Sequence, residues 1–262
     1  MRKKTLMTPE KPTSPFQNLL DKGKSLFDDV KQTYMHSNLL RQEQCIYCGK
    51  TLNGPYFYDL YDHRICKSHP IHFCVSCSSF CDQQAVSVAE GKYLCKRCQQ
   101  HHTTLKDAKE MVKMVREHYR SVGLGEIERF HLELVSVDAM RLMSGSGGDV
   151  LGMAFRNGQR YDIRVLKNLS HTAMVGILGH EILHIWQFQR GLNAPQRICE
   201  GFCDLGSFEI YSQIPTKHAQ VKINMLQEDP SPIYGDGYRI VKRFFDKAGW
   251  TGVIKKMEGY KL

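Results

Sequence analysis

The sequence predicts an α+β protein in which a cysteine-rich, metal-binding segment precedes a larger and mainly helical domain. Two observations carry this prediction. Paired cysteines recur with a 29-residue period, and an apolar helical pattern further along the chain carries a His-Glu-x-x-His motif. A chain of 262 residues is long enough for a large core. We expect three parts: a tail and amphipathic helix over 1–40, a double metal-binding module over 41–102 and a larger domain over 103–262.

The composition is that of a globular protein, with 42% hydrophobic and 24% charged residues. No apolar run approaches the roughly 18 residues of a membrane helix, and no secretory signal follows Met1. We therefore expect a cytoplasmic protein whose ten cysteines are reduced and serve metals rather than disulfides. The net charge is +9, but the Lys and Arg residues are scattered, so nucleic acid is not the partner we expect.

An N-terminal helix is predicted from Ser14-Pro15 to about Ser37, because Pro suits a first helical turn and apolar residues recur on one stripe. Acidic residues dilute any basic face. We expect this helix to pack on its own chain rather than on a membrane or a partner. The stripe consists of Phe16, Leu19, Leu20, Leu26, Phe27, Val30 and Tyr34.

Residues 45–98 contain two copies of one ligand pattern. Each copy has a Cys-x2-Cys turn, seventeen further residues and a second ligand pair, and every ligand recurs 29 positions later. Two such pairs joined by a hairpin suit one tetrahedral zinc, so we predict two closed structural zinc sites that supply much of the module's folding energy. The first site comprises Cys45, Cys48, Cys66 and His69, and the second comprises Cys74, Cys77, Cys95 and Cys98.

The first copy offers a second acceptable ligand pair, His63-x2-Cys66. His69 aligns with a ligand of the second copy, Cys98, whereas His63 aligns with Lys92. The repeat therefore favours His69, and His63 remains the alternate. The aromatic residues of this copy predict hairpin packing rather than a platform for stacking bases.

A helix is predicted to follow the module. Thr104-x-x-Asp107 is typical of a capping box, and glycines end the apolar pattern after Val122. Its expected buried stripe is Leu105, Ala108, Val112, Val115 and Tyr119.

Three strands are predicted next, over 130–137, 150–155 and 161–166, with a flexible loop over 144–148. The last two strands join through a turn that contains Asn-Gly, which is typical of a hairpin. If the strand over 161–166 forms the edge of the sheet, it could pair with an extended peptide through its backbone.

The His-Glu-x-x-His motif is predicted to lie on a helix that begins after Ser170 and ends at Gly191. Residues four apart share a helical face, so His180 and His184 can reach one metal, with Glu181 beside them to handle a proton of the attacking water. This pattern is the signature of zinc metallopeptidases. We expect an apolar face that leaves the motif clear: Met174, Ile177, Leu178, Ile182, Ile185 and Phe188.

A catalytic zinc needs a third protein ligand. Glu200, in the segment Cys-Glu-Gly-Phe-Cys-Asp, is our candidate, on a second helix that opens with Pro195. This arrangement is that of the glutamate zincins, or gluzincins, and predicts a zincin-like metallopeptidase domain. Asp204 lies one turn on and could orient a ligand histidine. Cys199 and Cys203 could compete for the metal, although we expect them to be small buried thiols.

Three segments in this order resemble one family. They are His-Glu-Ile-Leu-His-Ile-Trp-Gln, the Glu200 segment, and Asp229-Pro-Ser-Pro-Ile-Tyr-Gly-Asp-Gly-Tyr-Arg239. They resemble the catalytic domain of the LIM-containing peptidases first known as plant organ-size regulators, the "DA-one" family, over about 152–262. The upstream repeat similarly resembles a LIM domain, a double zinc finger of treble-clef or zinc-ribbon type, with a slightly longer gap between its fingers.

The resemblance implies a zinc endopeptidase that cleaves protein substrates, with a LIM-like module that binds a protein partner. Some plant members are activated by ubiquitylation, but this chain lacks an obvious ubiquitin-interacting segment, so that control is not expected. The chain looks like a stand-alone relative of bacterial type. Three zinc ions are expected: one catalytic and two structural.

Glu181 is the expected general base, and Tyr234 or Tyr238 is the expected donor to the oxyanion, with Tyr234 preferred. A structural interpretation competes, in which glycines shape a turn and Asp236 caps a helix over 238–247. Two other functions are alternatives: a non-catalytic zinc-binding adaptor and a nucleic-acid-associated zinc-finger protein. The intact Glu181 argues against the adaptor, because a purely structural site has no use for a base.

Overall fold

The computed structural model describes residues 44–145 and 150–261. The helix expected over 14–37 and most of the loop over 144–148 lie outside the described residues. Within the described part of the chain, no helix is long and apolar enough to cross a membrane.

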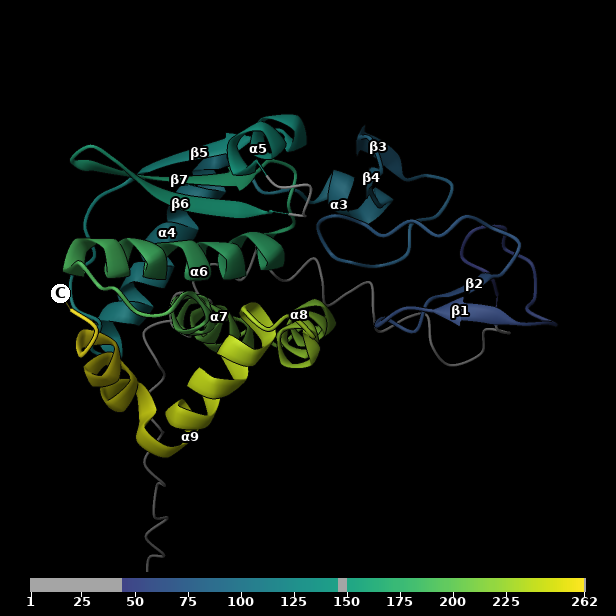
Figure 1. The fold of residues 1–262 in the computed structure, drawn as a ribbon. Helices are drawn as coiled ribbons and strands as arrows, with labels where there is room; N and C mark the ends of the chain where they lie inside the picture. Colours follow the sequence, from purple (N-terminus) through teal and green to yellow (C-terminus); the bar gives the residue numbers. More distant parts are fainter. Residues whose placement is uncertain (1–43, 146–149, 262) are drawn as a thin grey trace, which may run out of the picture.

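The cysteine-rich segment forms two short antiparallel hairpins and one short helix. Both hairpins fall between the ligand pairs of their copy, as the repeat predicts. In the ribbon view this segment extends to one side of the helical unit (Figure 1). Its elements are β1 (Tyr56–Tyr58), β2 (Arg64–Cys66), β3 (Val86–Ala89), β4 (Lys92–Leu94) and α3 (Lys96–Gln100).

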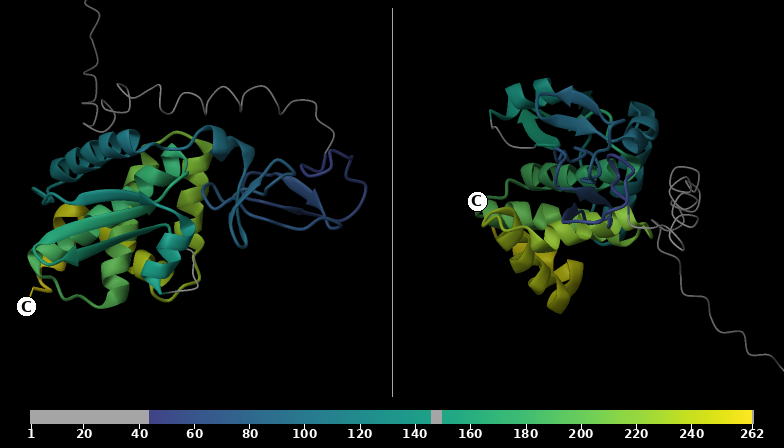
Figure 2. Two further views of the ribbon diagram at one scale, coloured as in Figure 1. Left: turned by 90° about the horizontal axis from the view of Figure 1, so that it is seen from above. Right: turned by 90° about the vertical axis from the view of Figure 1, so that its right-hand side faces the viewer.

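The remainder is an α+β unit built around one helix. A three-stranded sheet lies over one side of α6, and α7, α8 and α9 lie on the other side (Figures 1 and 2). The elements in chain order are α4 (Leu105–Ser121), β5 (His131–Val135), α5 (Val137–Ser144), β6 (Gly152–Asn157), β7 (Arg160–Leu166), α6 (His171–Arg190), α7 (Gln196–Ser212), α8 (Lys217–Glu228) and α9 (Tyr234–Glu258).

Local helix signals are confirmed. Thr104 and Asp107 form the capping box of α4. The Ser170 side chain accepts from the Ala173 N–H at the start of α6, and Gly191 ends that helix in the left-handed region, with φ of 62°. The expected stripe of α4 is wrong at Leu105, which is 40% exposed, because the helix turns Met111 and Met114 inward instead.

The condition for peptide pairing at the strand over 161–166, that it forms the sheet edge, is not met. The strand order is β5-β7-β6, with β5 parallel and β6 antiparallel to β7. Because β5 pairs with the far side of β7, β7 is central. The open edge that faces α6 belongs to β6, whose Gly152 lies against the side chain of Ile177 on that helix.

Two element boundaries also differ from expectation. The strand expected over 130–137 ends at Val135, because the Ser136 side chain caps a new helix, α5. The last helix begins at Tyr234 rather than at residue 238, since the Ser231 hydroxyl accepts from the Tyr234 N–H. Asp236 therefore does not cap the helix; it lies in the first turn and pairs with Arg239 at 2.6 Å.

Helix α6 is more deeply buried than a one-sided apolar pattern predicts. Leu178, Ile182 and Trp186 are fully buried, and Glu181 itself is only 6% exposed. The sheet covers one side of the helix and α7 covers the other. The motif therefore lies inside the protein, and its charges need partners there.

Candidate metal centres and active site

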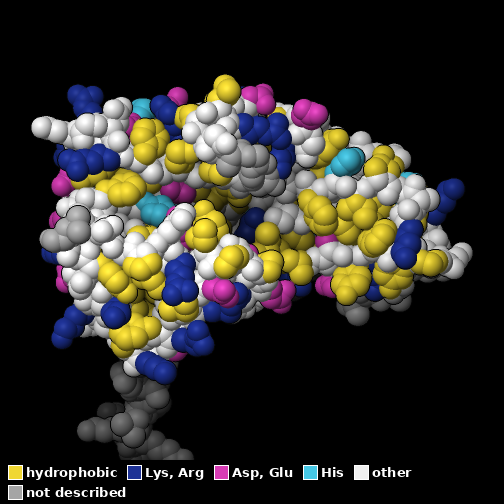
Figure 3. All heavy atoms as spheres, in the orientation of Figure 1, with side chains coloured by type: hydrophobic (Ala, Val, Ile, Leu, Met, Phe, Trp, Pro, Cys, Tyr) yellow, Lys and Arg dark blue, Asp and Glu magenta, His cyan; other side chains and the backbone are white. Residues whose placement is uncertain are grey.

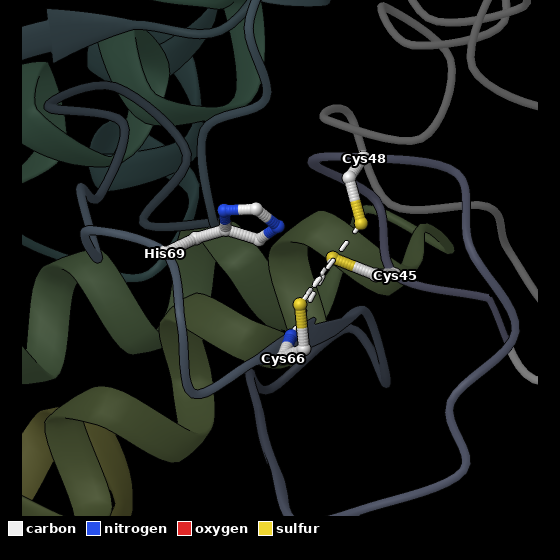
Figure 4. A group of neighbouring side chains, drawn as sticks. All are labelled: Cys45, Cys48, Cys66 and His69. Carbon is white, nitrogen blue, oxygen red and sulfur yellow. Dashed lines mark hydrogen bonds between the residues drawn. The ribbon is translucent and has the colours of Figure 1, made fainter.

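The first cysteine group gathers the four residues that the repeat selects. Cys45, Cys48, Cys66 and His69 point toward one another from the turn, β2 and the segment after it (Figure 4). The Cys66 sulfur lies 3.6 Å from the Cys45 sulfur and 4.0 Å from the Cys48 sulfur. Tetrahedral zinc with Zn–S bonds of about 2.3 Å places thiolates about 3.8 Å apart. The spacing therefore fits a zinc ion.

Cys45 is prepared to bind a metal as a thiolate. Burial would raise the pKa of Cys45, but backbone N–H groups, including that of Cys66, outweigh it and lower the pKa to about 7. A thiolate is the form that coordinates metal.

His63, the alternate ligand, lies elsewhere. Its Nδ1 is 3.1 Å from a carboxylate oxygen of Asp59 and 2.9 Å from the Ser79 hydroxyl. Asp59 is buried and also accepts from the backbone of Tyr61 and Phe80. His63 therefore helps to join the two copies of the repeat, and the structure gathers His69 with the cysteines instead.

The second cysteine group contains Cys74, Cys77, Cys95 and Cys98. Three of its members are buried and Cys95 is half-buried. The Cys77 and Cys95 sulfurs lie 3.8 Å apart, which again fits tetrahedral zinc. Both cysteine groups could therefore hold a metal ion, while the assignment of each residue as a ligand stays a prediction.

The third group lies between α6 and α7. His180 Nε2 and His184 Nε2 are 3.1 Å apart, and one Glu200 oxygen lies 3.2 Å from the first and 3.4 Å from the second. Bonds of about 2.0–2.1 Å to a tetrahedral zinc separate such ligands by about 3.3 Å. The three atoms thus form one face of a tetrahedron of the size that zinc requires.

Asp204 orients His180 by bonding the ring nitrogen that does not face the site. Its carboxylate accepts from His180 Nδ1 at 2.9 Å, which leaves Nε2 directed at the site. Burial would lower the pKa of His180, but the Asp204 and Glu200 carboxylates outweigh it and raise the pKa well above the ordinary value. Burial would likewise raise the pKa of Glu200, but the two histidines lower it to about 2. The site therefore favours a positive charge, which a metal cation supplies.

A buried thiol, Cys203, competes with Glu200 for the third position, since its sulfur lies within 4.8 Å of both histidine nitrogens. We favour Glu200 for two reasons. Its oxygen completes the tetrahedral face, whereas the Cys203 sulfur accepts from Gln187 Nε2 at 3.1 Å. Burial and the Glu200 charge also raise the pKa of Cys203 well above that of an ordinary thiol.

Glu181 lies beside the histidine group, and the pKa of its carboxylate is shifted. Burial raises the pKa of Glu181, although the two histidines and the Ala154 N–H act in the opposite direction. A carboxylate with a raised pKa is a better proton acceptor near neutral pH.

The two tyrosine candidates have different surroundings. Tyr234 is 43% exposed, and burial together with the Glu200, Asp204 and Glu181 charges raises the pKa of Tyr234, so its hydroxyl lies within the field of the site. Tyr238 is 2% exposed, and its ring packs against Phe208 with centroids 5.9 Å apart. The preference for Tyr234 as the oxyanion donor stays a prediction.

Two glycines, Gly201 and Gly237, allow the helix that begins with Tyr234 to lie close against α7. A Cβ on Gly201 of α7 would lie 2.2 Å from the backbone of Gly237, and one on Gly237 of α9 would lie 2.1 Å from the Arg197 carbonyl oxygen. The glycines of the Tyr-Gly-Asp-Gly-Tyr segment thus lie inside a helix rather than a turn, and they let two helices touch backbone to backbone. The recurrence of glycine within this segment was the feature of the sequence that could have indicated such a contact.

On the face shown in Figure 3, Lys and Arg side chains are spread among acidic and hydrophobic ones, and the surface is hollowed between the helical unit and the cysteine-rich segment. The rings of Tyr56 and Phe57 lie beneath cations of their own hairpin, Arg64 and Lys67, at 5.1 and 5.4 Å. Comparison with known proteins gives no match: no family model, no curated protein and no solved structure matches the chain.

Proposed function

We propose that the chain is a zinc-dependent endopeptidase of the gluzincin type, with a LIM-like module that binds a protein partner. The observation that carries this proposal is the tetrahedral face formed by His180, His184 and Glu200, with Glu181 beside it and Asp204 behind it. The resemblance of three segments to the DA-one peptidases supports the same function.

Zinc bound to the three ligands would supply Lewis acidity, which activates water and polarises the scissile carbonyl. Glu181 takes a proton from the attacking water and delivers it to the leaving amine, a role that its raised pKa supports. The Tyr234 hydroxyl donates a hydrogen bond to the developing oxyanion.

The substrate is an extended peptide segment that pairs with the open edge of β6. The Leu166 N–H donates to the Leu151 carbonyl at 2.9 Å, so the backbone groups of these opposed residues point toward each other. In an antiparallel pair such residues alternate with residues whose backbone groups point outward. The outward groups of β6 therefore belong to Gly152, Ala154 and Arg156. An edge of this kind binds chains by strand addition and tolerates varied sequences.

The test combines metal analysis with proteolysis. We expect three zinc ions per chain, and two in His184→Ala. Glu181→Gln should keep all three while cleavage of an unstructured peptide library, followed by mass spectrometry, falls by about 10²–10⁴-fold. Glu228→Gln makes the same change at an exposed position on α8 and controls for it.

Undiminished cleavage by Glu181→Gln would remove Glu181 as the base. Three zinc ions without any cleavage by the wild-type chain would favour the adaptor. Binding of DNA or RNA that weakens steeply with salt would favour the nucleic-acid hypothesis.

A further inference from the structure

Strand β6 approaches α6 most closely at the turn that carries Glu181. A Cβ on Gly152 would lie 2.6 Å from Ile177 Cγ2 and 2.8 Å from Glu181 Oε1. Real side chains do not tolerate such distances, so only glycine fits here without a shift of the strand or of Glu181. The strand backbone therefore rests directly on the carboxylate.

The next outward-pointing residue of the same strand reaches the same carboxylate. Ala154 lies two positions along β6, where the register directs its N–H away from β7. That N–H faces the Glu181 carboxylate closely enough to lower its pKa. An outward N–H at a sheet edge would otherwise bond to water or to an incoming strand.

The Glu181 side chain is buried against its own helix, which limits the other groups that can fix its position. It is 6% exposed, and Ile177 lies one turn before it on the same face of α6. A buried carboxylate without a fixed donor would adopt several rotamers, and a base that is misplaced by about 1 Å loses much of its effect.

We propose that Gly152 and Ala154 are positioning residues for Glu181: the missing side chain of Gly152 makes room for the carboxylate, and the Ala154 N–H fixes one of its oxygens. The proposal deepens the proposed function and rests on it for its catalytic consequence. Strand β6 then has two roles, since the edge that pairs with the substrate also holds the base. Placement of the base and alignment of the peptide are thereby set by the same backbone.

The functional test uses proline to remove single N–H groups. Proline is tolerated at edge positions whose N–H points away from the sheet. Ala154→Pro removes the N–H that contacts Glu181, and Arg156→Pro removes the next outward N–H of the same strand. We expect Ala154→Pro to have a kcat about 10–100-fold below that of Arg156→Pro, at equal zinc content and equal unfolding midpoint. Ala154→Gly, which keeps the N–H, should restore kcat. Equal kcat values in the two proline variants would overturn the catalytic role.

The contact itself is tested without any activity. We expect the Ala154 amide to exchange its hydrogen at least about tenfold more slowly than the Arg156 amide. In Glu181→Ala the Ala154 amide should exchange as fast as the Arg156 amide. Equally fast exchange of both amides in the wild-type chain would overturn the contact, whether or not the chain is a peptidase. Slow exchange in a chain without peptidase activity would retain the contact and reject only the proposed function.

Discussion

The two copies of the cysteine repeat have the same ligand spacing and different surroundings. The first group has one buried member, Cys45, and among the described residues its small core has Cys45, Ile65 and Phe80 as buried members. The second group has three buried cysteines and shares its core with Val221, which belongs to α8 of the helical unit.

The second copy is joined to the helical unit at several points. The Ser76 hydroxyl accepts from the N–H of Ser170, the residue that caps the motif helix, at 2.8 Å. The Lys222 ammonium, on α8, donates to the Ser78 hydroxyl at 3.1 Å. Burial lowers the pKa of Lys222, and nearby thiolates of the second group oppose that shift. A buried cation therefore lies beside the group that carries the negative charge.

The first copy meets α8 through an exposed ion pair between Asp62 and Lys217 at 3.7 Å, and through the buried ring of Tyr61, whose centroid lies 6.2 Å from that of His218. The comparison teaches that ligand spacing specifies a metal site, while residues outside the repeat decide whether that site is part of the core. We expect the second site to stabilise the helical unit strongly and the first to stabilise it less.

The largest expected effect on stability comes from removing one zinc ligand from each cysteine group in turn. Cys77→Ser should remove one zinc and destabilise the whole chain by about 3 kcal/mol or more, because a structural zinc contributes folding free energy to everything that packs on it. Cys48→Ser should also remove one zinc but lower the stability of the helical unit by less than about 1 kcal/mol. Thermal unfolding followed by helical circular dichroism measures both. Equal shifts in the two variants would contradict the comparison.

Acid offers a way to weaken the helical unit without changing a cysteine. Burial lowers the pKa of His118 on α4 to about 4. Because the unfolded pKa is about 6.5, the unfolded chain binds more protons between pH 6.5 and 4, so stability falls as pH falls through that window. At pH 5 the loss relative to pH 7 is at most about 2 kcal/mol. His118→Gln should reduce this pH dependence in denaturant titrations; an unchanged pH dependence would contradict the assignment.

The contact between α8 and the second copy is tested by Val221→Ala. Val221 is 1% exposed, so the lost packing should cost about 1–2 kcal/mol. Met225→Ala, one turn on and 41% exposed, should cost less than about 0.5 kcal/mol. Urea midpoints give both values. Zinc release to a chelator should also accelerate in Val221→Ala, and an unaltered release rate would show that α8 does not protect the second site.

The smallest effect is expected at the first copy. Lys217→Ala removes an exposed ion pair with Asp62, which is worth at most about 0.5 kcal/mol and is screened by salt. A midpoint shift as large as that of Val221→Ala would mean that the first copy also depends on α8.

The helix boundaries near the site could be predicted because their causes are local. The capping box at Thr104 and the caps at Ser170 and Gly191 involve residues three or four positions apart. The spacing of His180 and His184 follows from the helical repeat alone. The cysteine groups were predictable for the same reason, since a repeated spacing predicts a repeated geometry.

Other features depend on which elements meet. The sequence contains no signal that β5 joins the far side of β7, so it left open which strand forms the sheet edge. The last helix begins before the expected residue 238 because the turn in which Ser231 accepts from the Tyr234 N–H is only one of several turns that the sequence allows. Gly152 and Gly201 needed the structure, because what excludes a side chain at each is a neighbour from another part of the chain.

The sequence by itself determined the motif helix, the choice of His69 by the repeat, and Glu200 as the candidate third ligand. Only the tertiary structure decided that Glu200 completes a tetrahedral face with the histidines, that β6 rests on Glu181, and that the second cysteine group packs against α8. The physical reason is the distance along the sequence between the residues that interact. Hydrogen bonds within a turn and ligand pairs on one helix are set by neighbouring residues, whereas close packing is set by surfaces that meet only after the chain has folded.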